Sequence, residues 1–283
     1  MEVIPSDIAG EDHLYFEQES EETDMSEQNV STHQAEHAIS IRQVGFLSPF
    51  RWLRQGWEDM RYSLTASLGH GLIITAMGWV VIIFTNNHLY LFAAAISGFM
   101  LVSPLMAAGL YELSRRKESG QPVSFDMSLN GLRINGRRLA RLAALLVLSI
   151  FVWFGLSAII FKNYFHGELP AISGAIYQTS WITSADATFL LTYGAVGGVI
   201  AVGVFLLTAV SVPMIMDRST GLIAAMGTSV RAVMANLPAM LLWAVLLVTL
   251  TAIGFATQLW GMIVIIPLLG HATWHAYRDI VGA

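Results

Sequence analysis

Three histidines stand at positions where an imidazole could do chemistry inside a membrane. His271 and His275 are one helical turn apart near the C-terminus, and His70 lies between two glycines in an apolar stretch. His70 follows Arg61 by nine residues and His271 precedes Arg278 by seven. At 1.5 Å per helical residue, both would lie roughly 10–14 Å inside the level of these arginines. An ionisable side chain at that depth is costly, so we treat the three histidines as a candidate intramembrane polar site.

Three interpretations of this site stay open. The histidines either pack and hydrogen-bond to neighbouring groups, form a protonatable site on a transport path, or ligate a haem or metal. A transport path would use Ser103 and Thr273 as relay groups, and a haem would be held by His70 and His271. The sequence has no cysteine and no nucleotide-binding loop, nucleophile motif or paired-carboxylate motif. We therefore expect no catalytic residue, enzyme activity, metal site or nucleic-acid partner, and no cofactor unless the haem interpretation holds.

The elements that would position these histidines are membrane helices. Hydrophobic residues make up 55% of the chain and charged residues only 12%, about half the charged share of a soluble domain. Four long intervals lack Asp, Glu, Lys and Arg, and a spanning helix needs roughly 20 apolar residues. The pattern predicts an all-α, polytopic membrane protein with six spans in three hairpins, at about residues 65–84, 89–110, 142–161, 188–212, 239–256 and 259–276.

The charge distribution predicts the orientation. Of the 15 Lys and Arg residues, all but Lys162 fall on one side of a six-span chain. Cationic residues near membrane helices are retained in the cytoplasm, so we expect both termini to be cytoplasmic. Residues 1–40 carry 11 acidic residues and no Lys or Arg, and we expect a disordered cytoplasmic tail followed by a membrane domain at 41–283.

A hairpin pattern repeats along the chain. A short amphipathic segment with an arginine precedes each odd span and is expected to form a cytoplasmic interfacial helix. Each even span has a proline in or near its cytoplasmic half, and we expect helix kinks at Pro104, Pro213 and Pro267. The loop between the second and third spans is basic, which makes it a candidate for contact with lipid headgroups through Arg115, Arg116, Lys117, Arg133, Arg137, Arg138 and Arg141.

Sequence patterns around the first two spans resemble a known family. They are W-L-x-x-G-W-x-D from Trp52 to Asp59, S-L-x-x-G from Ser67 to Gly71, and S-P-L-x-A-x-G-L-Y-E-x-S-R-R from Ser103 to Arg116. Most of the chain after about residue 40 is similar to a family of bacterial integral membrane proteins, domain of unknown function 2189. The resemblance implies a six-helix protein of the bacterial inner membrane, and some family members are labelled as cytochrome c oxidase subunits.

The expected function follows from these patterns and from the resemblance. Three histidines at membrane depth and six helices are too few for the catalytic oxidase subunit, which needs about twelve helices and six histidine ligands. We expect a non-enzymatic auxiliary factor of a larger membrane or respiratory complex, embedded in the lipid bilayer. A transporter-like bundle for a small solute or lipid and a haem protein are the alternatives, and a homo-oligomer is compatible with each.

Overall fold

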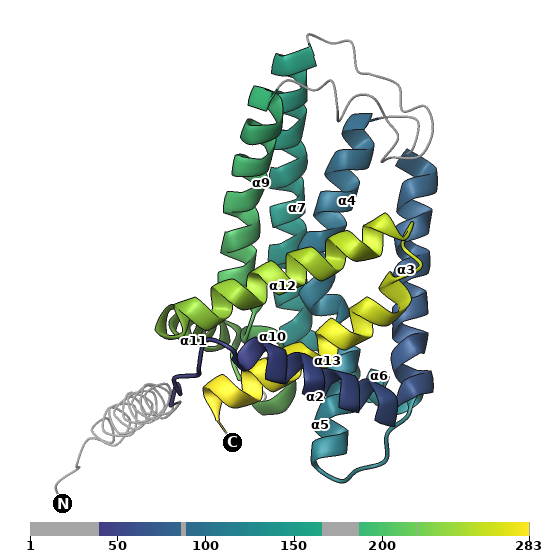
Figure 1. Cartoon of the computed structure of the whole chain (residues 1–283), viewed down its shortest axis with the longest axis vertical. Helices are drawn as coiled ribbons and strands as arrows, with labels where there is room; N and C mark the ends of the chain where they lie inside the picture. The colour runs from purple at the N-terminus through teal and green to yellow at the C-terminus, as the bar shows by residue number, and fades with distance from the viewer. Residues whose placement is uncertain (1–39, 86–88, 166–186, 219, 283) are drawn as a thin grey trace, which may run out of the picture. The chain divides into compact units, whose positions relative to one another are not determined.

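The computed structural model describes residues 40–85, 89–165, 187–218 and 220–282 (Figure 1). The acidic segment predicted to be a disordered tail lies outside these ranges except for Ser40. Residues 41–283 form one compact unit, to which the following description refers. All regular structure in the described ranges is α-helical: α2 (Ser48–Tyr62), α3 (Leu64–Thr85), α4 (Leu89–Met106), α5 (Ala108–Glu118), α6 (Phe125–Ile134), α7 (Gly136–Phe165), α9 (Ala187–Thr208), α10 (Ser211–Arg218), α11 (Leu222–Ala235), α12 (Leu237–Ala256) and α13 (Met262–Val281).

Five stretches within the described ranges are long and apolar enough to cross a membrane. They are Leu64–Thr85, Tyr90–Glu118, Gly136–Phe165, Ala187–Arg218 and Leu237–Ala256. The sixth predicted span, 259–276, is not among them. Its helix, α13, begins at Met262, and its C-terminal half is polar and packs against α2 and α5. Figure 1 shows α12 and α13 running obliquely to α3, α4, α7 and α9.

The predicted repeat has a structural counterpart at the start of three long helices. A short helix and a long helix are separated by one residue at Ser63, Asn135 and Asn236. At each break, the side chain donates a hydrogen bond to the carbonyl four residues earlier, at 3.2 Å, 3.4 Å and 3.1 Å respectively. A side chain that satisfies a carbonyl of the short helix compensates for the interrupted backbone ladder. The short helices α2, α6 and α11 overlap the segments expected to be interfacial, which begin at Gly56, Gly131 and Gly227, although most of the second segment lies in α7.

Pro267 and Gly71 determine how closely α3 and α13 approach. Proline has no N–H, so the carbonyl of Ile263, four residues earlier, loses its partner within α13. A Cβ placed on Gly71 would lie 2.1 Å from this oxygen, so only glycine fits at this contact. The freed carbonyl is thus covered by the glycine backbone of α3, and the small residue permits this close approach of the two helices.

Hydrogen bonds and ion pairs bring helix ends from distant parts of the chain to the same region. The Arg42 amide donates to the Ile280 carbonyl at 2.7 Å, and the Asn236 side chain donates to the Arg42 carbonyl at 3.0 Å. Arg278 pairs with Glu118 at the end of α5 at 3.1 Å and with Asp217 at the end of α10 at 3.3 Å. The start of the described chain, the last turn of α13 and the ends of α5 and α10 therefore lie together.

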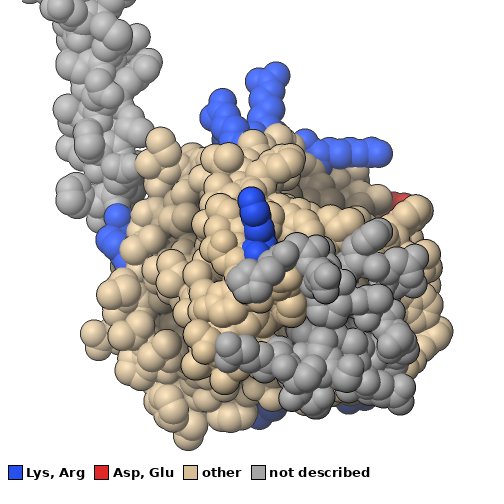
Figure 2. Space-filling model, turned by 90° about the horizontal axis from the view of Figure 1, so that it is seen from above, with Lys and Arg blue, Asp and Glu red and all other residues tan. Residues whose placement is uncertain are grey.

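The opposite ends of the long helices carry little charge. Figure 2 looks onto the upper end of the view in Figure 1, and the described surface is almost entirely uncharged, with most of the visible Lys and Arg side chains at its margin. Beneath it, α4, α7 and α9 pack through aromatic side chains, including Phe161 against Phe189 with ring centroids 5.2 Å apart. Offset and edge-on aromatic pairs of this kind stabilise helix contacts without any polar group.

Candidate functional site

Side chains of four helices meet in a buried cluster that we call the polar junction. Its members are Asp59 of α2, Ser67 of α3, Ser114 and Lys117 of α5, and His271 and His275 of α13. Ser67 and His271 are 0% exposed and Asp59 is 5% exposed. The α2–α13, α3–α13 and α5–α13 packing holds these groups together, although they lie as far as 216 residues apart in the sequence.

The hydrogen bonds of the junction determine which atom is the donor in each pair. Ser114 Oγ lies 2.6 Å from Asp59 Oδ2 and 2.7 Å from His271 Nδ1. An ionised carboxylate only accepts, so the single Ser114 proton goes to Asp59 and His271 Nδ1 must donate to Ser114. The other nitrogen of the neutral ring, Nε2, then accepts from Ser67 Oγ at 2.9 Å. We infer this tautomer from the network, which leaves no ring nitrogen of His271 without a partner.

Asp59 is the anion around which the junction is built. Lys117 Nζ donates to Oδ1 at 2.6 Å, and His275 Nε2 donates to Oδ2 at 2.9 Å. Burial raises the pKa of Asp59, but the hydrogen bonds from His275, Lys117 and Ser114 outweigh it and lower this pKa to about 2. The carboxylate therefore stays charged throughout the physiological pH range and holds α2 against α5 and α13.

A second buried carboxylate lies one helical turn from the junction. Glu112 of α5 is 1% exposed and accepts two hydrogen bonds from Arg115 and one from Arg116, each 2.7 Å long. A Cβ on Gly131 would come within 2.8 Å of the Glu112 carboxylate, so α6 passes directly over it. The glycine lets α6 cover the ion pair, and bidentate pairing with Arg115 compensates the carboxylate for its lost solvation.

His70 lies beside this region but outside the polar junction. Its Nδ1 donates to the Ala66 carbonyl at 2.9 Å, and its Nε2 faces Ser128 Oγ of α6 at 3.2 Å. A Cβ on Gly109 would be 2.4 Å from Nε2, so the ring rests directly on the backbone of α5. A haem held by His70 and His271 would have to displace this backbone and break the Ser67 bond to His271. The residues present do not fit the group.

The structure brings only part of the predicted site together. His271 and His275 are both in the polar junction, and His70 packs next to it. Ser103 is exposed on α4, away from the histidines' hydrogen bonds. Thr273 donates to the Leu269 carbonyl at 2.7 Å and is also a partner of Tyr111. No hydrogen bond in the described residues joins Ser103 or Thr273 to His70 or His271, and the relay role of both stays a prediction.

The three prolines expected to kink helices have different surroundings. Helix α4 ends two residues after Pro104, and Pro213 lies in the first turn of α10 after a break, whereas α13 continues through Pro267.

The seven basic residues expected to contact lipid headgroups fall into two groups. Arg115, Arg116 and Lys117 form the inward ion pairs described above. The other four predicted headgroup contacts stay predictions. Arg133, Arg137 and Arg141 are exposed. Arg138 is half-buried and donates a hydrogen bond to the Asn135 side chain at 3.4 Å.

Sequence reasoning missed the acidic centre of the junction. Asp59 was assigned to an interfacial segment and Glu112 was not considered buried, because charge alone does not reveal which face of a helix is covered. A signal was present, because Asp59, Ser67, Glu112 and Ser114 all occupy specified polar positions in the patterns that carry the family resemblance. Polar residues at fixed positions inside otherwise apolar helices indicate buried partners.

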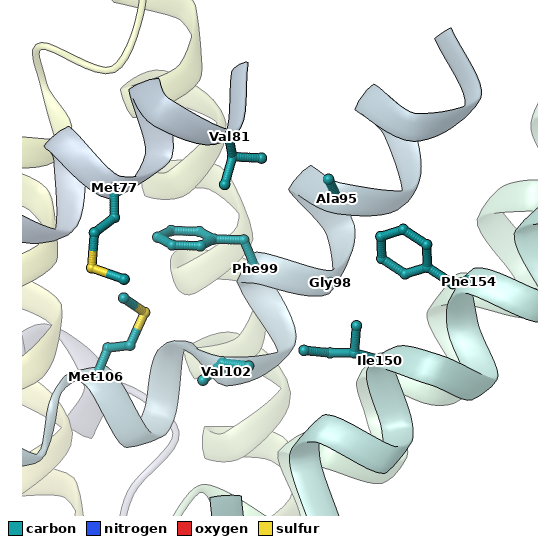
Figure 3. Close-up of a pocket in the computed structure, with 9 residues that line it drawn as sticks. All are labelled: Met77, Val81, Ala95, Gly98, Phe99, Val102, Met106, Ile150 and Phe154. Carbon is teal, nitrogen blue, oxygen red and sulfur yellow. The ribbon is translucent and has the colours of Figure 1, made fainter. Parts of the chain in front are cut away.

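An apolar groove lies outside the polar junction and shares only α3 with it. It has a volume of about 350 Å³ and lies between α3, α4 and α7. In Figure 3 the thioethers of Met77 and Met106 point toward each other on the same side of α4 as the Phe99 ring, and Phe154 and Ile150 lie on the opposite side of α4, next to Gly98. Every lining residue is apolar: Met77, Val81, Ala95, Gly98, Phe99, Val102, Met106, Ile150 and Phe154.

Comparison with known proteins agrees with this architecture. No curated protein and no solved structure matches the chain at a significant level. One family model matches residues 91–217, the stretch from α4 to α10 that includes Glu112, Ser114 and most of the groove. The family model is described as Predicted integral membrane protein (DUF2189), and the resemblance drawn from the sequence is confirmed for this stretch.

Proposed function

We propose that this chain is a non-enzymatic protein of the bacterial inner membrane that serves as an auxiliary component of a larger membrane assembly. One contrast supports the proposal. The polar junction is closed, with its serine, histidine and aspartate groups bonded to one another and buried, while the groove at membrane depth is apolar and open. A protein with these features can bind an apolar partner through its groove, whereas the side chains of its polar junction are not accessible to a substrate.

The junction has the residue types of a hydrolase but not the arrangement. In a catalytic triad the imidazole lies between the serine and the carboxylate, and the serine hydroxyl faces the substrate. Here Ser114 lies between His271 and Asp59, and Ser67, the hydroxyl bonded to the other ring nitrogen, is 0% exposed. A nucleophile must first be accessible to its substrate, so we assign the junction to helix packing.

We further propose three hairpins with both termini in the cytoplasm. Two observations support this topology. The start of the described chain, residue 118, residue 217 and the C-terminus are joined by hydrogen bonds and ion pairs. All Lys and Arg residues except Lys162 belong to that side of the hairpins, as the positive-inside rule requires. In the third hairpin α13 returns to this side alongside α2.

The groove favours a second candidate, a bundle that handles lipid. Its volume is within the range of small-molecule sites, and its flexible methionines can adapt to an alkyl chain. The haem interpretation has the weakest support, because both histidines already use their nitrogens in protein hydrogen bonds. A Soret band from protein that is purified with haem supplied would support the haem interpretation.

The groove also provides the test. Ala95→Phe would fill it, while Ala201→Phe places the same ring on the exposed side of α9, away from the groove. We expect the unmodified protein to co-purify with a larger assembly in mild detergent, the Ala201 variant to retain it and the Ala95 variant to lose it. Loss of bound lipid from the Ala95 variant, with the assembly intact, supports the lipid-handling candidate instead. A wild-type protein that is only a monomer or homodimer refutes the auxiliary role.

A further inference from the structure

The outer face of α2 is organised in adjacent rows of different chemistry. Phe50 and Trp57 are seven residues apart, as are Arg54 and Arg61, and seven residues bring a helix back to within about 20° of its starting direction. The aromatic row and the arginine row are therefore neighbours. Phe50 is 52% exposed and Trp57 is 43% exposed, and both arginines are exposed.

The surface next to the arginine row has mixed charge. Glu58 lies there, on the side away from the aromatic residues, and pairs with Arg54 at 3.5 Å. Further round the helix, Tyr62 covers Lys117 at the cytoplasmic end of α5, with the ammonium 5.3 Å from the ring centroid. From one edge to the other, the exposed surface passes from aromatic through cationic to mixed charge.

The two edges of this gradient differ in their distance from the charged end of α5. Tyr62, which covers Lys117, lies about 120° round the helix from Phe50. The edge that carries Phe50 and Trp57 is therefore the one away from Lys117. The inner face carries Trp52 and Asp59, seven residues apart, and contacts Trp243 of α12 and Lys117 of α5. The order of the exposed rows matches that from acyl chain to headgroup to water.

We propose that this face of α2 is a binding surface for the anionic surface of the bilayer, with Phe50 and Trp57 in the upper acyl region and Arg54 and Arg61 against lipid phosphates. The face has the charge complementary to an anionic headgroup layer. Helix α2 also leads into the membrane span α3 after the single residue Ser63, so it lies at the membrane boundary. Its inner face carries Asp59, and binding of lipid outside is thereby connected to the polar junction inside.

The cysteine-free chain makes the depth of each row measurable. Phe50→Cys and Glu58→Cys place a fluorophore on two exposed sides of one helix in nanodiscs containing phosphatidylglycerol. We expect the label at 50 to be quenched by a quencher on the upper acyl chain and protected from iodide, and the label at 58 to behave in the opposite way. Equal responses of the two labels to either quencher refute the proposal. This measurement needs no assembly partner, so its failure is distinct from failure of the auxiliary role.

Anionic recognition is tested by charge-matched variants. Arg61→Gln removes a guanidinium from the arginine row, and Arg231→Gln removes an exposed one from α11, which has no aromatic row. We expect retention of phosphatidylglycerol over phosphatidylcholine, read by native mass spectrometry, to fall on the order of fivefold for Arg61→Gln at low salt. A smaller loss at high salt is expected from screening. An equal loss in both variants, with melting temperatures unchanged, overturns the assignment to α2.

Discussion

Replacement of Asp59 by alanine removes the one anion of the polar junction. Lys117 and His275 lose their acceptor, and Ser114 loses the partner that orients it toward His271. Breaking a buried ion pair by deleting one partner costs about 3–5 kcal/mol. The side chain of Lys117 is 30% exposed and can turn toward water, so we expect the lower end of this range, about 3 kcal/mol of unfolding free energy.

Glu58→Ala is the matched control. This neighbouring carboxylate is on the exposed face of the same helix, and its 3.5 Å pair with Arg54 has side chains 76% and 56% exposed. Exposed pairs contribute at most about 1 kcal/mol, so the control should change stability little. Denaturant titrations of both variants in detergent micelles, followed by tryptophan fluorescence, give the comparison. If Asp59→Ala costs no more than Glu58→Ala, the junction is not a packing centre and our reasoning is refuted.

The same carboxylate has a pH signature. The Asp59 pKa is lowered to about 2 in the folded protein from its ordinary value of 3.8. The unfolded chain therefore binds this proton first as the pH falls, and the stabilisation is complete above about pH 4 and is lost as the pH approaches 2. This difference in pKa is worth about 2 kcal/mol. Asp59→Asn should lose this part of the acid sensitivity, and an unchanged stability profile between pH 4 and pH 2 would contradict it.

Other positions give independent predictions. Gly71→Ala should destabilise the protein by about 2 kcal/mol, because the new methyl would overlap the Ile263 carbonyl, while Gly194→Ala, where a Cβ meets nothing within 4 Å, should be neutral within about 1 kcal/mol in the same titration. His271→Ala should cost about 2–4 kcal/mol and increase proteolysis of α13, because it removes the ring that bonds to the buried hydroxyls of Ser67 and Ser114. Glu112→Ala should cost about 3 kcal/mol and Glu112→Gln less, since the amide retains an acceptor, and equal costs would argue against an ion-pair role.

Composition and charge periodicity determined the environment of this protein without any tertiary information. Long uncharged runs indicate membrane-embedded helices, and their lengths predict six spans, five of which correspond to candidate spans in the described part of the structure. The repeated pattern of amphipathic segment and apolar run indicates that short helices precede three of the long ones. In the structure a single polar residue separates each short helix from its long helix. These features are local, and the sequence encodes them directly.

The tertiary structure decided what the polar residues do. The sequence singles out His271 by its depth, but its hydrogen-bond partners Ser67 and Ser114 are 204 and 157 residues away, and no spacing rule connects them. Packing also determines the environment of residues 259–276, because the polar half of this segment is covered by α2 and α5. A buried charge is tolerated only where the fold supplies its counter-ion and hydrogen bonds, and that supply depends on which helix faces meet.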